Sequence, residues 1–153
     1  MSDSEQIMSC RLNSSCECIG VLISMVEVVG RRAGLSDKQI NRMKLAVDEM
    51  FANIARHAYH GHEGAVEMSA SWRKKQLRFE LRDYADPLSA SDIRSWARPA
   101  AAGDELKPGG LGMQLMRAVM DRVEHEALAD GNRWLLIKDL GVSAPNEEHS
   151  YEA

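Results

Sequence analysis

The pattern that most constrains this fold is a run of apolar residues at three- and four-residue steps through residues 37–59. Such spacing puts side chains on one face of an α-helix, and here it selects Ile40, Met43, Val47, Phe51, Ile54 and Ala58. Ser36 precedes the run and Gln39 follows three residues later, which is the spacing of a capping box. The sequence therefore predicts one long helix with a single buried stripe.

A second, polar row lies along the same helix. Glu49, Asn53 and His57 follow one another at four-residue steps, on a face well away from the apolar stripe. An amide oxygen suits a hard cation such as magnesium, especially one that already holds phosphate oxygens. A carboxylate one turn earlier can accept the proton of a hydroxyl group. The alternative is a solvated helix face with no chemical role.

Two elements are expected before this helix. The segment "IMSCRL" (residues 7–12) is typical of an edge strand, and residues 16–33 are expected to form a helix capped by Ser14 or Ser15. Gly34 then occupies the position where a helix commonly ends in a left-handed conformation.

Beyond residue 64 the apolar period changes from helical steps to alternation. Residues 65–72 and 76–83 predict an antiparallel hairpin, with Arg73, Lys74 and Lys75 at its bend. Residues 123–129 and 133–140 predict a last hairpin, turned by Asp130, Gly131 and Asn132.

Between the hairpins lie a loop and a helix. Residues 84–108 hold three of the four prolines and have the length of a functional lid, with one short helix over "ASDIRSWA". The stretch "PGGLGMQLMRAVMDRV" predicts a glycine turn that opens a helix, with inward-facing Leu111, Leu115, Ala118 and Val119. Together the elements predict an α+β two-layer α/β sandwich: a mixed, mainly antiparallel sheet with helices on one face.

Composition sets the broad class. The 153 residues, 44% hydrophobic and 27% charged, fit one domain with a full core, which we place at residues 7–140, followed by an acidic, flexible tail over residues 141–153. A net charge of −4 gives no reason to expect nucleic acid. No signal peptide or membrane span is recognised, so a cytoplasmic protein is expected. Cys10, Cys16 and Cys18 are expected to be reduced thiols, with a Cys-x-Cys metal site as the alternative.

Two further stretches carry possible chemistry. Asp83 ends an apolar strand beside the irregular loop, where a carboxylate can accept hydrogen bonds from an exocyclic amine such as that of adenine, or can simply form a turn. Gly109, Gly110 and Gly112 stand at a helix start, where backbone N–H groups can approach phosphate closely. The spacing matches neither a Walker P-loop nor a dinucleotide-binding fingerprint.

The order of these features resembles a known superfamily. A Glu-x3-Asn helix, an aspartate at a strand end, a lid and a Gly-x-Gly helix start are similar to the GHKL (Bergerat) ATP-binding fold of histidine kinases, gyrase and Hsp90. Within it, "LAVDEMFANIARHAY" and "GGLGMQLMRAVMDRVEHE" resemble the anti-sigma-factor serine-protein kinases of bacterial partner-switching systems. The resemblance covers roughly residues 7–140.

The resemblance implies a role for each matching residue. Asn53 would bind the Mg²⁺ that bridges the ATP phosphates, Glu49 would be the general base, and Asp83 would hold the adenine amine. The glycine turn and the lid would enclose the phosphates. The full ATP-binding set implied by the family pattern is Asn53, His57, Asp83, Ala85, Gly109, Gly110, Leu111, Gly112 and Met113.

The resemblance also implies partners. Such a protein is a homodimer that sequesters a sigma factor or phosphorylates a serine of a STAS-domain anti-sigma-factor antagonist. Phosphorylation adds about −1.5 to −2 of charge, which is enough to break a complementary interface.

Two departures from the family pattern favour an alternative. Ala85 stands where the family has the glycine of Asp-x-Gly, and Asn132 and Arg133, followed by Trp134, stand where it has threonines. A GHKL-fold regulator that acts only by protein binding, with weak or lost ATP use, is therefore the second reading. The kinase domain of a two-component histidine kinase is a third, disfavoured because too few residues precede the long helix for a phosphoacceptor hairpin.

Two groups outside this pattern remain open. His57, His60 and His62 could form a metal cluster, although His57 fits better beside the nucleotide or at the helix end. Trp96, flanked by Arg94 and Arg98 in the predicted lid, is a candidate contact residue.

Overall fold

The strands form one sheet in the order β1-β2-β3-β5-β4, and every neighbouring pair is antiparallel. The computed structural model describes residues 5–73, 75–96 and 112–141. Its strands are β1 (Glu5–Asn13), β2 (Ala65–Arg73), β3 (Gln76–Asp83), β4 (Arg122–Leu128) and β5 (Gly131–Asp139). The predicted α+β sandwich is confirmed, with an antiparallel rather than a mixed sheet over the described strands.

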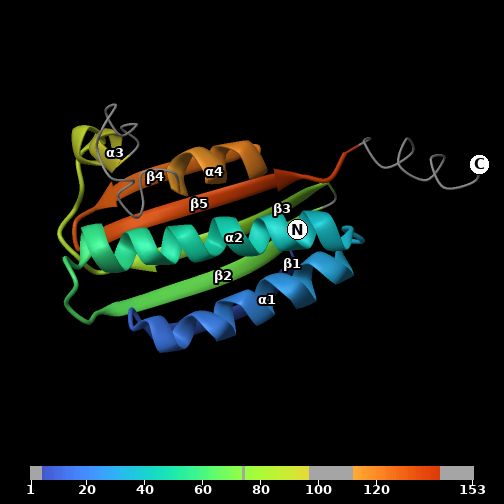
Figure 1. The fold of residues 1–153 in the computed structure, drawn as a ribbon, viewed down its shortest axis with the longest axis horizontal. Coiled ribbons are helices and arrows are strands. Elements are labelled where there is room, and N and C mark those ends of the chain that lie inside the picture. The colour runs from blue at the N-terminus through green and yellow to red at the C-terminus, as the bar shows by residue number, and fades with distance from the viewer. Residues whose placement is uncertain (1–4, 74, 97–111, 142–153) are drawn as a thin grey trace, which may run out of the picture.

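The helices lie on one face of this sheet. They are α1 (Ile19–Arg32), α2 (Asp37–Asn53), α3 (Ala90–Trp96) and α4 (Gly112–Val119), with a short 3₁₀ turn η1 (Cys16–Cys18) and a π-helical turn η2 (Ile54–Ala58). Figure 1 shows α2 running along the sheet between α1 and α4, while α3 lies near the end of the sheet where β5 begins. The long helix is thus the central element of the helical layer.

The long helix forms as its sequence predicts at the N-terminal end. The Ser36 side chain accepts a hydrogen bond from the Gln39 backbone N–H, and the Gln39 side chain accepts one from the Ser36 N–H. All six residues of the predicted stripe are buried. Gly34, which separates α1 from α2, has a φ of 79°, as predicted for a left-handed helix end.

The start of α1 differs from the prediction. Neither Ser14 nor Ser15 caps it; the N-cap is Cys18, which has no side-chain cap hydrogen bond. The Cys18 N–H instead donates to the Ser15 carbonyl at 3.0 Å, and this bond closes the 3₁₀ turn η1 ahead of the helix.

Both predicted hairpins are present, and the second has a tighter turn than expected. Gly131 and Asn132 are not turn residues but pair with Leu128 and Ala127 in the β4–β5 ladder. The strand extends this far because Asn132 is buried opposite Asp83 of β3.

The buried face of α4 also differs from the prediction. Met113, Met116 and Met120 are the residues that it buries, whereas Ala118 is exposed. These methionines follow the i, i+3, i+7 spacing of one helical face, and their long side chains reach the core. Leu115 and Val119 are half-buried, and Leu111 lies outside the described residues.

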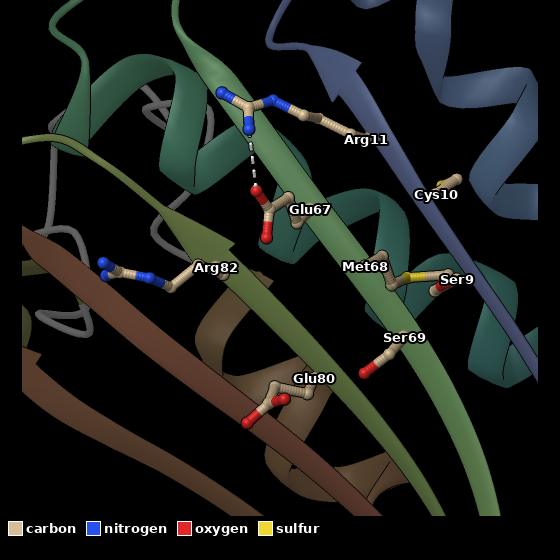
Figure 2. A pocket seen from close by; sticks show the side chains of 8 residues that line it. All are labelled: Ser9, Cys10, Arg11, Glu67, Met68, Ser69, Glu80 and Arg82. Atoms are coloured by element: carbon tan, nitrogen blue, oxygen red, sulfur yellow. Dashed lines mark hydrogen bonds and ion pairs between the residues drawn. The ribbon is translucent and has the colours of Figure 1, made fainter. Parts of the chain in front are cut away.

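Over β1, β2 and β3 the other face of the sheet is polar. It has a hollow of about 440 Å³, lined by residues of β1, β2 and β3: Ser9, Cys10, Arg11, Glu67, Met68, Ser69, Glu80 and Arg82. Figure 2 shows the ion pair between Arg11 and Glu67, whose nitrogen and oxygen atoms are 3.2 Å apart, at one end of this hollow. Its charged side chains are balanced in sign, and none belongs to the polar row of α2.

No helix within the described residues is both long and apolar enough to cross a membrane. Of the cysteines whose side chains are described, Cys10 and Cys18 are free thiols. Burial raises the pKa of the Cys10 thiol, which keeps it in the unreactive protonated form.

Candidate active site

The polar row of α2 contains buried groups without hydrogen-bond partners. Asn53 is fully buried, and neither its amide oxygen nor its amide nitrogen bonds to any described residue. One turn earlier, Oε2 of Glu49 is likewise buried and without a partner among the described residues. A buried polar group left unpaired costs about 1–3 kcal/mol, so these atoms suit a ligand better than they suit the isolated chain.

The helix widens directly after Asn53. Residues Ile54–Ala58 form a π-helical turn, closed by the Tyr59 N–H donating to the Ile54 carbonyl at 3.0 Å. Such turns often lie at functional sites, because they change the direction of the side chains that follow. Here the turn carries His57, the third member of the polar row.

Tyr59 fixes the end of this helix against the sheet. Its hydroxyl donates to the Ala65 carbonyl at 2.6 Å and accepts from the Tyr84 N–H at 2.8 Å. A Cβ on Gly64 would lie 2.2 Å from the Tyr59 ring, so the ring requires a glycine there. Sequence reasoning missed this role of Tyr59, although the glycine that follows its helix was a usable signal.

Asp83 stands at the centre of a buried hydrogen-bond network. Its Oδ1 accepts from the Asn132 side-chain amide at 2.9 Å and from the Ala85 N–H at 3.1 Å, and its Oδ2 accepts from the Trp134 indole N–H at 2.9 Å. The Asn132 oxygen lies 2.8 Å from Nε2 of His125 and accepts from the Leu88 N–H at 2.9 Å. Asp83 and Asn132 are both fully buried.

The two sequence departures have different places in this network. Asn132 and Trp134 supply donors to Asp83, whereas Arg133 lies on the opposite face of β5 and pairs with Glu80 and Glu126. Strand alternation accounts for the difference, since successive side chains point to opposite faces. Ala85 has no positive φ, so its methyl group causes no backbone strain.

Four rings join the two halves of the site. His57 stacks on Trp96 with ring centroids 4.8 Å apart, and Trp96 stacks on Trp134 at 5.3 Å. His125 contacts the Trp134 ring at 4.4 Å. The predicted contact residue of the lid, Trp96, is therefore buried, only 7% exposed, and lies between His57 of η2 and Trp134 of the Asp83 network.

The surroundings of His57 change the pKa of its imidazole. Burial lowers its pKa, and the charges of Arg56 and His60 lower it further. The neutral ring is therefore favoured in the stack. No group of three or more potential metal-binding side chains occurs among the described residues, so the alternative of a metal cluster at His57, His60 and His62 gains no support.

The glycine turn is placed only at its end. Gly109, Gly110 and Leu111 lie outside the described residues, while Gly112 is the first residue of α4. Met113 is buried in the core. The structure thus brings together residues of α2, η2, β3, α3 and β5, and α4 packs beside α2.

The sequence and the fold both match known proteins. A family model described as "Histidine kinase-like ATPase domain" matches residues 12–138. A serine-protein kinase RsbW from Bacillus pumilus (strain SAFR-032) is 28% identical over 134 residues, which cover 83% of this chain and 82% of that protein. The same-named protein from Staphylococcus aureus (strain MW2) is 26% identical over 128 residues, 80% of each chain.

Two solved structures have a similar fold. The catalytic domain of the histidine kinase ThkA aligns with a TM-score of 0.55 and 12% identity over 88% of this chain and 97% of that one. The histidine kinase domain of an Erythrobacter litoralis blue-light activated kinase aligns with a TM-score of 0.51 and 14% identity, over 80% of this chain but only 61% of that chain. At these identities the likeness concerns the fold alone.

Proposed function

Because the chain belongs to the histidine kinase-like ATPase domain family, we propose that it is an ATP-dependent serine-protein kinase and anti-sigma factor. It would sequester a sigma factor and phosphorylate a serine of a STAS-domain antagonist. The observation that carries the proposal is the pair of buried, unpaired groups on α2, the Asn53 amide and Glu49 Oε2. The likeness to serine-protein kinases supports the choice of a protein substrate.

The residues present fit Mg²⁺ and a nucleotide. The unpaired Asn53 oxygen is an uncharged oxygen ligand of the kind that Mg²⁺ accepts beside phosphate oxygens, and bound Mg²⁺ would neutralise charge on the transferring phosphoryl group. Glu49 Oε2 would accept the proton of the substrate serine. Asp83, held by Asn132 and Trp134, would orient the base.

Partner exchange follows from the same chemistry. A phosphoserine on the antagonist adds negative charge at the point where the antagonist meets the kinase. Repulsion between this phosphate and the nearby Glu49 carboxylate would weaken the contact. The released kinase, proposed to be a homodimer, would then bind the sigma factor.

A second function is favoured by a different observation. The Asp83 carboxylate already accepts three hydrogen bonds from the protein, and Trp96 stacks on Trp134, one of its three donors. A regulator that binds partners without using ATP would need no further access to this group.

The test is phosphate transfer from labelled Mg-ATP to a purified STAS-domain protein of a partner-switching system, with its serine-to-alanine version as the blank. We expect transfer by the wild type, loss in Asn53→Ala, and a fall of about 10²–10⁴-fold in Glu49→Gln, the usual contribution of a general base. Asn41→Ala is the matched control, since Asn41 is exposed on the same helix.

The free energy of unfolding of the Asn53→Ala variant shows whether Asn53 serves the site or the stability of the fold. Asn53→Ala removes a buried amide that has no described partner, so the free energy of unfolding should stay equal or rise while transfer is lost. Transfer that survives in Asn53→Ala contradicts the proposal. Equal partner affinity with and without Mg-ATP, together with no transfer by the wild type, would favour the binding-only function.

A further inference from the structure

The indole of Trp96 lies in a slot between two other rings. Its ring centroid is 4.8 Å from that of His57 and 5.3 Å from that of Trp134, with interplanar angles of 24° and 28°. These values are those of offset aromatic stacking. The slot therefore accepts one flat ring, held on both faces.

The slot connects the two halves of the candidate site. On one side, His57 follows Asn53 by four residues on the helix that carries Glu49. On the other side, the indole N–H of Trp134 donates to Oδ2 of Asp83. A ring in this slot therefore stacks on the indole that donates to the carboxylate proposed to hold the base.

The chemistry of the slot matches a purine. An indole and a purine are both fused, planar five- and six-membered rings, and bases stack on aromatic side chains regardless of their identity. A carboxylate oxygen has two lone pairs; Oδ1 of Asp83 already accepts two hydrogen bonds, but Oδ2 accepts one. Oδ2 can therefore accept a further N–H, such as an exocyclic amine, once Trp96 is absent.

Trp96 is also the most deeply buried residue of α3, and Ile93 packs beside it against the core. Five residues of this helix are exposed, Ile93 is half-buried, and Trp96 is buried. The N-terminus of α3 is capped locally: the Asp92 carboxylate accepts from the Ser89 N–H, and the Ser89 hydroxyl oxygen accepts from the Asp92 N–H. Withdrawal of the Trp96 side chain would thus leave α3 held to the core only by the half-buried Ile93 among the residues of this helix.

We propose that Trp96 is an internal competitor of the nucleotide: its indole fills the base subsite between His57 and Trp134, and binding of a purine requires its withdrawal. The inference rests on the proposed function, because it assigns this subsite to the base of ATP. Occupation of the site would then be coupled to movement of α3.

The first test compares nucleotide affinity by calorimetry with Mg-ADP in the wild type, Trp96→Ala and Trp72→Phe. We expect Trp96→Ala to lower Kd by about tenfold, which corresponds to a free site open about one tenth of the time. Trp72→Phe should match the wild type, since Trp72 lies on β2 outside the ring stack. Equal or weaker binding by Trp96→Ala overturns the inference.

The second test needs no activity. Stacked indoles give an exciton couplet in circular dichroism, which should be present in the wild type, absent from Trp96→Phe and Trp134→Phe, and retained in Trp72→Phe. Addition of Mg-ADP to the wild type should remove the couplet. A couplet that persists at saturating nucleotide overturns the inference while leaving the proposed function intact.

The two proposals fail in different ways. If the wild type binds Mg-ADP as tightly as Trp96→Ala, the competitor role is wrong and nucleotide binding stands. If neither protein binds Mg-ADP, the nucleotide function itself is wrong, and the assignment of the slot falls with it.

Discussion

Asn132 holds the Asp83 carboxylate in place and links it to the segment that follows β3. Its amide donates to Asp83 and to the Asp86 carbonyl, while its oxygen accepts from the Leu88 N–H. The strand β5 contains no threonine, and the aspartate is held by an amide and an indole. Asn132 and Trp134 are thus sufficient donors for the buried carboxylate of Asp83.

This network predicts a large cost for one variant and a small cost for its neighbour. Asn132→Ala should lower the free energy of unfolding by about 1–3 kcal/mol or more, because buried partners lose their hydrogen bonds. Arg133→Ala should cost about 0–1 kcal/mol, because its partly exposed ion pairs contribute little. Urea unfolding measures both values. Equal costs for the two variants would contradict the placement of these side chains on opposite faces.

Alternation along β5 could have predicted this difference from the sequence. Two residues that flank Arg133 face the helices, so only they can reach Asp83. The ring stack could not have been predicted, because it joins His57, Trp96 and Trp134 from three distant segments. Neither the hydrophobic periodicity nor the spacing of residues in the sequence predicts which loop residues pack into the core.

At the scale of elements, periodicity predicted most of the architecture. The stripe of α2, its capping box and both hairpins are confirmed. The π-helical turn Ile54–Ala58 was not predicted, since its residues continue the helical period. The buried face of α4 was predicted wrongly, because the three inward methionines, Met113, Met116 and Met120, were passed over and the exposed Ala118 was included.

The close approach of β3 and β5 at Gly131 predicts that a side chain at this position destabilises the protein. A Cβ on Gly131 would lie 2.0 Å from the Asp83 carbonyl oxygen, and the residue has a φ of 155°. Gly131→Ala should therefore force the strands apart at the candidate site and lower the thermal midpoint. Gly20→Ala is the matched control with the opposite sign, since a Cβ there meets nothing within 4 Å and alanine favours a helix by about 0.5–1 kcal/mol.

Thermal unfolding followed by circular dichroism checks this pair. A Gly131→Ala variant as stable as the wild type would show that the strands can separate here without cost. The candidate site would then lack the rigid frame that the network around Asp83 implies.

At the scale of the whole molecule, one face of the sheet carries the helices and the candidate site. The other face carries balanced ion pairs and the hollow of Figure 2. The sequence predicted this two-layer arrangement, because strands that alternate apolar and polar residues must cover one face. The boundaries at residues 7–140 and the role of the tail stay predictions, since residues 142–153 lie outside the described ranges.

The central claim is that the α2 residues and Asp83 form a magnesium-dependent nucleotide site. The most direct measurement is calorimetric titration of the wild type with a non-hydrolysable ATP analogue, with and without Mg²⁺. We predict saturable binding that requires Mg²⁺ and is lost in Asn53→Ala but kept in Asn41→Ala. Absence of binding at millimolar nucleotide, in Trp96→Ala as well as in the wild type, would contradict the account.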